Sequence, residues 1–344
     1  MVFSLPFRGM KRWWRLPIFW VTLGTIFFLI FYILVVVFRH LNYFSAHFDL
    51  GNMDQVMWQS LHGHWFQMVD SGSGELISRL NYHADVLLLL YLPFYALIQH
   101  PLTMAVLQVI AVGSAALPLF WFAKKQLPGW VASILAVSYL VYPPLLWNVI
   151  FDVHAVTLVV PLMIWAVWAV DARRWWIYAV MIVLLPLAKE EVGVTVALLG
   201  ALVAWKVRPR WIGLVTAVYG LAITALMLFV VIPSVRQSAD HFFLKQYAEY
   251  GNTTTDVVKG MVTHPVQVVR TMLNAEGRSY LYHLLGPVGG FSIVAVPYVL
   301  VAAPEFAVNT LSAFSGMRTI VFQYTSVLTP IILLSAVIGL GRWW

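Results

Sequence analysis

A run of 22 residues without a charge, from Pro17 to Phe38, sets the first limit on what this chain can fold into. As an α-helix it would rise about 33 Å, enough to cross a hydrocarbon core of ~30 Å. The run is longer than the ~7–15-residue apolar region of a signal peptide, and no small-residue cleavage site follows it. We therefore expect a membrane-spanning helix that the mature chain keeps.

The composition of the whole chain fits a membrane protein. Of the 344 residues, 61% are hydrophobic and 10% are charged, and the mean hydropathy is +0.83, unlike an ordinary soluble domain. The net charge of +7 comes from short loops between apolar runs, where membrane orientation and anionic lipid account for it better than nucleic acid does. Without cysteines the chain has no disulfide, thiolate metal site or cysteine nucleophile. We expect an all-α, polytopic integral membrane protein whose partner is the lipid bilayer.

Further apolar runs bring the predicted number of membrane segments to about ten. They lie at 83–99, 102–123, 130–150, 155–170, 175–188, 192–205, 211–234, 281–314 and 319–340. The run 281–314 is interrupted by Gly and Pro and is interpreted as two short crossings, with one crossing plus a loop as the alternative. The chain is thus expected to form a single membrane domain, 1–344, made of a first span (16–38), an outer loop (39–82), a helical core (83–234), a second outer loop (235–280) and terminal spans (281–340).

Three short basic loops set the predicted orientation: Lys124-Lys125, Arg173-Arg174 and Lys206/Arg208/Arg210. The N-terminus is also basic (Arg8, Lys11, Arg12, Arg15), which predicts a cytoplasmic position in the plasma membrane. If the 83–99 run makes no net crossing, all three loops lie on the same side as the N-terminus. The acidic residues then face outward, except Asp171 and, with its side undecided, Glu305. We therefore expect the chemistry on the outer side.

The first outer loop carries two carboxylates, Asp49 and Asp54, beside the membrane. Residues 52–61 are predicted to form a helix with Met53, Val56 and Met57 on one face. A carboxylate near a helix N-terminus is also favoured by capping and by the helix dipole. Asp49 and Asp54 are therefore either part of a functional site or a helix cap with a solvated polar face.

The triplet Lys189-Glu190-Glu191 lies between two apolar runs of about 14 residues, each covering only about 21 Å as a helix. The turn is therefore expected below the membrane surface, where each charge costs roughly 2.5–3.5 kcal/mol on insertion scales and needs a partner, water or ligand. The alternative to a functional cavity is a hairpin tip in which Lys189 pairs with Glu190 or Glu191.

Two histidines and an aspartate lie at other outward turns. In Phe151-Asp152-Val153-His154, the Asp152 carboxylate and the His154 imidazole can share a metal or a proton, or simply bond within the turn. These side chains are predicted to approach Asp49 or Glu190. His83, at the start of the next apolar run, is either part of the same site or a capping or interface residue.

Arg318, Gln323 and Tyr324 lie near the end of the chain and precede an apolar span. Arg318 would hold a phosphate or carboxylate if it faces outward, or extend to an interface as a snorkelling arginine. The basic and aromatic residues of 235–280 indicate a lipid-headgroup surface or an ordinary solvated one. Walker, dinucleotide-binding, His-Glu-x-x-His and Gly-x-Ser-x-Gly motifs are absent from the sequence.

Taken together, these motifs resemble a prokaryotic membrane family catalogued as domain of unknown function 2079. The resemblance covers roughly residues 15–340 and rests on the motifs in this order: Phe48-Asp49-Leu50-Gly51-x-x-Asp54-Gln55, His83, Phe151-Asp152-x-His154, Lys189-Glu190-Glu191 and Gln323-Tyr324-Thr325. That family in turn resembles the GT-C glycosyltransferases, which take sugars from polyprenyl-phosphate donors at the outer face of the membrane.

The resemblance implies a GT-C-like fold and transfer of a sugar to an acceptor whose identity stays open. Asp49 matches the acidic residue central to catalysis in the first outer loop, and Asp54 is second. The substrate-binding residues would be His83, Asp152, His154, Lys189, Glu190, Glu191, Arg318, Gln323 and Tyr324. A divalent cation, Mg or Mn, would be held by Asp54, His154 and Glu190. Two other functions stay open for this sequence: a non-enzymatic carrier or flippase of a lipid-linked or polar solute, and a structural subunit.

Overall fold

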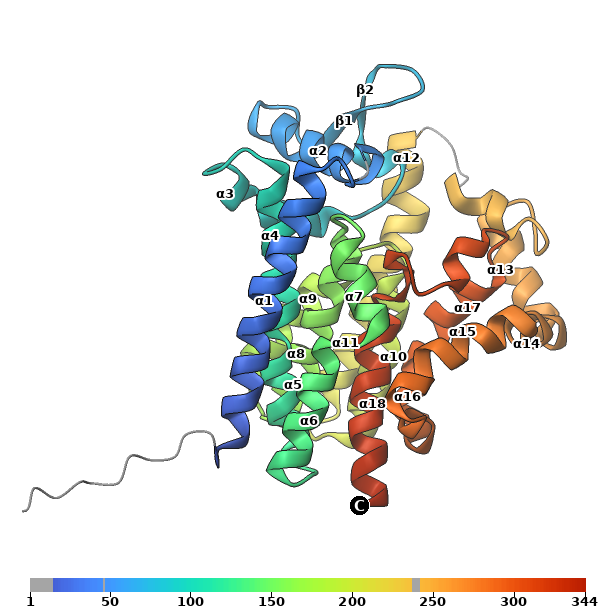
Figure 1. Cartoon of the computed structure of the whole chain (residues 1–344). Helices are drawn as coiled ribbons and strands as arrows, with labels where there is room; N and C mark the ends of the chain where they lie inside the picture. The colour runs from blue at the N-terminus through green and yellow to red at the C-terminus, as the bar shows by residue number, and fades with distance from the viewer. Residues whose placement is uncertain (1–14, 46, 237–241) are drawn as a thin grey trace, which may run out of the picture.

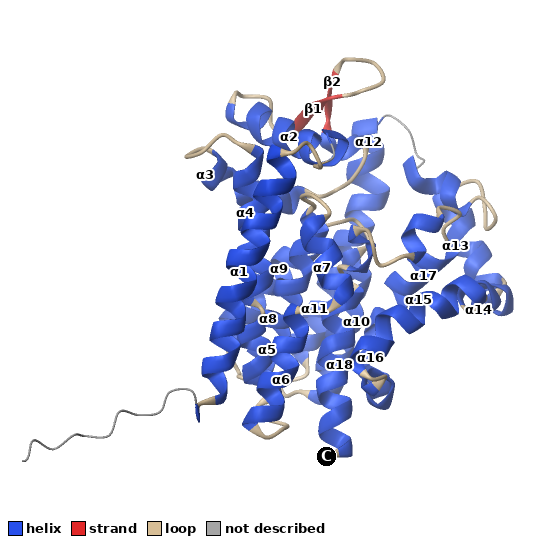
Figure 2. Cartoon of the chain, in the orientation of Figure 1, coloured by secondary structure: helices blue, strands red, loops and turns tan. Residues whose placement is uncertain are grey.

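The computed structural model describes residues 15–45, 47–236 and 242–344, and these parts are almost entirely helical (Figures 1 and 2). The helices of the main bundle are α1 (Pro17–Leu41), α4 (Pro101–Ser114), α5 (Ala116–Ala123), α6 (Gly129–Leu140), α7 (Pro143–Ile150), α8 (Val159–Asp171), α9 (Trp175–Leu184), α10 (Val192–Lys206), α11 (Trp211–Leu226), α12 (Ile232–Arg236) and α18 (Leu328–Trp343).

Smaller elements cover one end and one side of this bundle (Figure 1). They are α2 (Asn52–Leu61), β1 (Gln67–Val69), β2 (Leu76–Ser78), α3 (Leu92–Tyr95), α13 (Thr254–Thr263), α14 (Pro265–Met272), α15 (Ala275–Leu285), α16 (Val296–Val299) and α17 (Ala303–Leu311). The two strands pair antiparallel, with Met68 opposite Ile77.

Four helical segments are long and apolar enough to cross a membrane: Pro17–Leu41, Pro101–Ala123, Trp211–Arg236 and Phe291–Leu311. The pair α6 and α7, bent by 41°, makes a fifth if it counts as one span. The other apolar helices are only 10–17 residues long: Val86–Tyr95, Ala155–Asp171, Trp175–Leu187, Val192–Lys206 and Leu328–Trp343. The all-α character is confirmed, and the described residues contain four or five candidate membrane spans. Ten crossings stay a prediction, because the other apolar helices are short.

The region 281–314 differs from its first interpretation as two crossings. Only Phe291–Leu311 is long and apolar enough to cross. The preceding helix α15 is polar, with Glu276 in its first turn and His283 in its last. Two glycines follow in left-handed backbone conformations, Gly289 at φ 62° and Gly290 at φ 68°. Residues with a Cβ rarely adopt such conformations. The turn separates α15 from the apolar segment, so the region consists of one candidate span and a polar helix.

Small residues bring α10 and α11 into close contact. A Cβ added at Gly200 would lie 2.4 Å from the backbone nitrogen of Ala217, and one at Gly193 would lie 2.4 Å from the carbonyl oxygen of Gly220. Such approaches are possible only without side chains, as in many interfaces between membrane helices. This tight pair fixes the position of the Lys189–Glu191 turn, which leads directly into α10.

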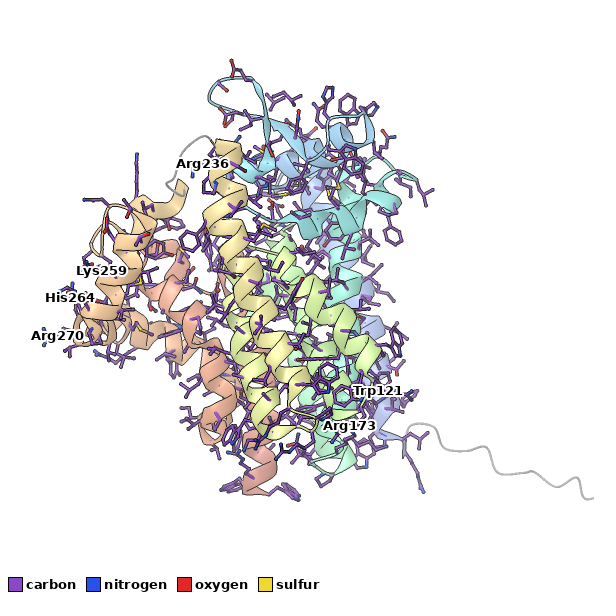
Figure 3. All side chains as sticks on the ribbon, turned by 180° about the vertical axis from the view of Figure 1, so that it is seen from behind. Trp121, Arg173, Arg236, Lys259, His264 and Arg270 are labelled. Atoms are coloured by element: carbon purple, nitrogen blue, oxygen red, sulfur yellow. The ribbon has the colours of Figure 1, made fainter. Side chains whose placement is uncertain are left out.

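One end of the bundle, here called the basic end, gathers the three basic loops. Lys125 Nζ lies 2.8 Å from Asp171 Oδ2, and Arg173 donates a hydrogen bond to the carbonyl oxygen of Arg208. The start of α1 is at the same end, since Ser133 Oγ donates to Pro17 O at 2.7 Å. Figure 3 shows Arg173 at one end of the molecule and Arg236 at the other. The predicted grouping of the basic loops is confirmed; Arg8, Lys11 and Arg12 lie outside the described residues.

The opposite end, here called the loop end, carries α2, the β1–β2 hairpin and α3 (Figure 1). Helix α2 occupies the predicted segment, Asn52–Leu61, and buries Met53, Val56 and Met57 as expected. The run 83–99 forms only short helical turns, and α3 lies at this end with α2. This agrees with the prediction that 83–99 makes no net crossing.

Candidate functional site

The turn after α7 brings His154 to the loop after α1. Asp49 belongs to a π-helical turn, His47–Gly51, and its Oδ1 lies 3.4 Å from His154 Nε2. The Phe151 ring stacks on the His154 ring at 5.6 Å between centroids. Two segments about 105 residues apart in the sequence therefore meet through one carboxylate and one imidazole, as the sequence predicted.

A buried glutamine, Gln108 on α4, holds this turn in place. Its Nε2 donates to the Asp152 carbonyl oxygen at 2.8 Å, and its Oε1 accepts the His154 N–H at 3.1 Å. Gln108 is only 1% exposed. Asp152 has φ 46°, so its backbone is in a conformation uncommon for a residue with a side chain. These two hydrogen bonds, here called the Gln108 clamp, fix the backbone of the turn and therefore the position of the His154 ring.

The electrostatic environment keeps Asp49 ionised. Burial alone would raise the pKa of Asp49, but the hydrogen bond and charge of His154, together with the charge of Arg79, bring that pKa below its ordinary value. Arg79 is itself buried and binds Asp85 through two nitrogens, with Nη2 2.7 Å from Oδ2. Asp49 therefore carries its negative charge throughout the neutral pH range.

The charged side chains of the Lys189–Glu191 turn form two separate contacts. Glu190 reaches back to the loop end: its Oε1 lies 3.0 Å from His83 Nδ1, and its Oε2 accepts the Ala84 N–H at 3.1 Å. Lys189 instead pairs with Glu191. The paired-hairpin alternative is confirmed for Lys189 and Glu191 only, since Glu190 joins His83 across 107 positions of sequence.

A cavity of about 240 Å³ lies between these groups. Seven of the predicted site residues line it: His83, His154, Lys189, Glu190, Glu191, Gln323 and Tyr324. Lys189 Nζ lies 5.9 Å from the centre of the Tyr324 ring. Asn309 fixes the Gln323–Tyr324 segment, because its Nδ2 donates to the Tyr324 carbonyl oxygen at 2.8 Å. We call this space the charged cavity.

Four predicted residues do not line the charged cavity. Asp49 approaches it only through its contact with His154. Asp54 accepts a hydrogen bond from the Tyr95 hydroxyl at 2.7 Å instead. The Asp152 side chain lines a separate small space beside Arg39. Arg318 Nη1 lies 3.0 Å from Glu276 Oε2, so it pairs with α15 and neither faces the cavity nor extends alone to an interface. Their placement depends on packing between distant helices, which spacing in the sequence does not encode.

The predicted metal ligands are not brought together. Asp54 bonds Tyr95, His154 contacts Asp49, and Glu190 binds His83 and Ala84. Within the described ranges, no group of three or more His, Asp or Glu side chains could hold a metal ion. Asp54, His154 and Glu190, as arranged, do not form a divalent-cation site, and a bound Mg or Mn stays a prediction.

Neither Asp49 nor Asp54 acts as a cap for α2. The N-cap residue is Gly51, which makes no side-chain capping bond. His83 likewise faces Glu190 and not a helix end. In the region 235–280, Lys259, His264 and Arg270 lie at the outer edge of α13 and α14, away from the bundle (Figure 3).

Sequence reasoning missed several residues that shape this site. Gln108 and Glu305 are polar residues inside apolar segments, a signal that could have found them. Glu305 on α17 is 3% exposed and interacts electrostatically with Lys189, Glu190 and Glu191. It therefore lies with the acidic residues of the Lys189–Glu191 turn and not with Asp171 at the basic end. Arg79 and Asp85, six positions apart, gave a weaker signal.

Comparison with known proteins gives one match. The profile of a family described as "Predicted membrane protein (DUF2079)" matches residues 39–343. Neither a curated protein nor a solved structure is significantly similar to the chain. The matched range includes every residue of the charged cavity.

Proposed function

From the premise that this chain belongs to the DUF2079 family of predicted membrane proteins, we propose that it is a GT-C-like membrane enzyme that transfers a sugar from a polyprenyl-phosphate donor to an acceptor. The donor and acceptor would meet at the charged cavity of the loop end. If the basic end faces the cytoplasm, as the positive-inside rule predicts, this is the outer face of the membrane.

The observation that carries the proposal is the contact between His154, which lines the charged cavity, and Asp49, whose Oδ1 lies 3.4 Å from His154 Nε2. Asp49 and His154 come from separate loops, and their side chains are 26% and 10% exposed. A buried polar or charged group at membrane depth is expensive, so such contacts most often belong to functional sites. The pair offers an ionised carboxylate next to a group able to donate or accept a proton.

In this mechanism Asp49 acts as the general base. It takes the proton from the acceptor hydroxyl or amine as the acceptor atom bonds to the anomeric carbon, while the bond from that carbon to the phosphate oxygen breaks and its electron pair leaves with the phosphate. A weak base is adequate, because the phosphate leaving group already activates the donor. The lowered pKa of Asp49 serves to keep the carboxylate ionised until this step.

The other charges of the cavity suit the two poles of such a transition state. The anomeric carbon gains positive charge, which nearby carboxylates stabilise. The departing phosphate gains negative charge, and Lys189 is the cation that lines the cavity. Its contact with Glu191 holds the ammonium group in place before the donor binds.

The experiment that tests the proposal is transfer of radiolabelled sugar from polyprenyl-phosphate donors by purified protein in liposomes. Asp49→Asn should lower the rate by about 100-fold or more, the usual contribution of a positioned base. Glu75→Gln is the matched control, because Glu75 is an exposed carboxylate of the same outer loop. Equal transfer by Asp49→Asn and wild type would remove Asp49 from the mechanism, and an arm with EDTA tests whether a divalent cation takes part.

One observation favours the carrier as a second candidate. A cavity of about 460 Å³ lies at the basic end, and residues of α10 line it while the charged cavity begins just before the same helix. A carrier would open these two spaces to each other. Movement of a lipid-linked solute across liposomes without chemical conversion, abolished by Glu190→Gln, would support this candidate; conversion without movement would support the enzyme.

A further inference from the structure

The cavity at the basic end has two different walls. Its volume is about 460 Å³, within the range of ordinary ligand pockets. Lys125, Arg173 and Lys206 form a cationic side, while Phe122, Met163 and Leu199 are among the residues of an apolar side. A ligand that fills it must carry negative charge at one end and hydrocarbon at the other.

The cationic side has unbalanced charge. Asp171 is the carboxylate among the lining residues, and it pairs with Lys125 at 2.8 Å. Arg173 donates to a neutral carbonyl, that of Arg208, and Lys206 Nζ lies 3.5 Å from the centre of the Trp205 ring. Within the described part of the chain, no carboxylate forms an ion pair with Arg173 or Lys206. Two cations are therefore left to face an anionic ligand.

A buried hydroxyl lies on the apolar side. Ser335 on α18 is 1% exposed, lines the cavity, and its Oγ has no hydrogen-bond partner among the described residues. A buried donor without an acceptor is costly, and a ligand that supplies an acceptor removes this cost. Ser335 precedes Arg342 by seven residues, about 10 Å of helix rise, so it lies deeper in the bundle than the basic end.

Aromatic residues place this cavity at the level of a membrane interface. Trp121 packs against Trp165 and Trp168, with ring centroids 6.0 and 5.3 Å away, and Figure 3 shows Trp121 and Arg173 at the same end of the molecule. Tryptophan and basic residues together are typical of the headgroup region of a bilayer. A phosphate at this depth belongs more naturally to a lipid than to a soluble compound.

We propose that this cavity binds an anionic phospholipid, with its phosphate between Arg173 and Lys206 and its acyl chain against the apolar side. An ester carbonyl, which lies between the headgroup and the chain of a phospholipid, supplies the acceptor for Ser335. The site is separate from the charged cavity, so it stands whether or not the protein transfers sugars.

The test is lipid binding to delipidated, detergent-purified protein, followed by native mass spectrometry. One molecule of phosphatidylglycerol should bind tightly to each protein molecule, and phosphatidylcholine should bind more weakly. Arg173→Gln/Lys206→Gln should weaken phosphatidylglycerol binding about 30-fold, from the loss of two cationic contacts. Lys124→Gln/Arg210→Gln removes the same charge from exposed residues that do not line the cavity, and should change binding less than about twofold.

Two further arms keep the result interpretable. Ser335→Leu, which narrows the apolar side without changing charge, should also weaken phosphatidylglycerol binding; if the double variant does not fold, this variant and the wild-type lipid preference decide. Soluble glycerol 3-phosphate should not compete. Equal binding of the two lipids, an equal loss in both double variants, or full competition by glycerol 3-phosphate would overturn the proposal.

Discussion

Two contacts of similar length, one at each end of the bundle, differ in their surroundings. At the loop end, His83 Nδ1 lies 3.0 Å from Glu190 Oε1, and the side chains are 21% and 5% exposed. At the basic end, Lys125 Nζ lies 2.8 Å from Asp171 Oδ2, and the side chains are 50% and 32% exposed. Water can solvate the exposed pair when it breaks but not the buried one. The ion pair of the loop end is therefore buried within the fold, whereas that of the basic end lies on the surface.

The largest expected effect on stability is that of Glu190→Ala. The change leaves the His83 imidazole and the Ala84 N–H without their carboxylate, which should lower the free energy of unfolding by about 3 kcal/mol. Thermal unfolding in detergent measures it. Glu75→Ala, at an exposed carboxylate of the hairpin turn, is the control. Equal shifts of the unfolding temperature in both variants would mean that the buried contact contributes no more to stability than an exposed carboxylate does.

Gln108→Leu tests whether the turn at the loop end is held by hydrogen bonds. It removes both bonds to the Asp152–His154 turn, at a cost of about 1–3 kcal/mol. Since His154 would lose its position beside Asp49, Gln108→Leu should also transfer sugar more slowly than wild type. The control is Gln126→Leu, at the basic end, which should keep the wild-type transfer rate. A Gln108→Leu protein with unchanged stability and rate would contradict the clamp.

The Asp49–His154 contact should also make stability depend on acidity. The pKa of Asp49 is lower in the folded protein than its ordinary value of about 3.9. Its contribution is therefore fully present above that ordinary value and is lost as the pH falls through the lower, folded-state value. Unfolding temperatures measured from pH 6 downward should fall less steeply below about pH 4 for Asp49→Asn than for wild type. Parallel curves would argue against the lowered pKa.

The smallest effect is expected at the basic end. Lys125→Gln breaks an exposed pair and should change the free energy of unfolding by less than about 1 kcal/mol. Added salt should reduce even this difference. A loss as large as that of Glu190→Ala would remove the distinction between the two ends.

Much of the fold could be predicted from local patterns. The period of Met53, Val56 and Met57 located α2, and the basic loops predicted which turns share an end, because both signals depend on neighbouring residues or on the membrane itself. The region 281–314 was harder, since the polar helix α15 and the double-glycine turn interrupt one apolar stretch.

The candidate site could be predicted in part. Charged residues at membrane depth must find partners, which explains why His154, Lys189 and Glu190 meet around the charged cavity. Asp54 and Arg318 instead have the partners Tyr95 and Glu276, which no sequence pattern indicated. The choice between such partners is made by packing between distant segments.

The measurement that tests the central claim most directly is the sugar-transfer rate of Asp49→Asn and Lys125→Gln in the same liposomes, each compared with wild type. The account predicts a loss of about 100-fold or more for Asp49→Asn, with the protein still folded, and a change within about twofold for Lys125→Gln. If Asp49→Asn transfers sugar at the full wild-type rate, the claim that the loop end carries the function is contradicted.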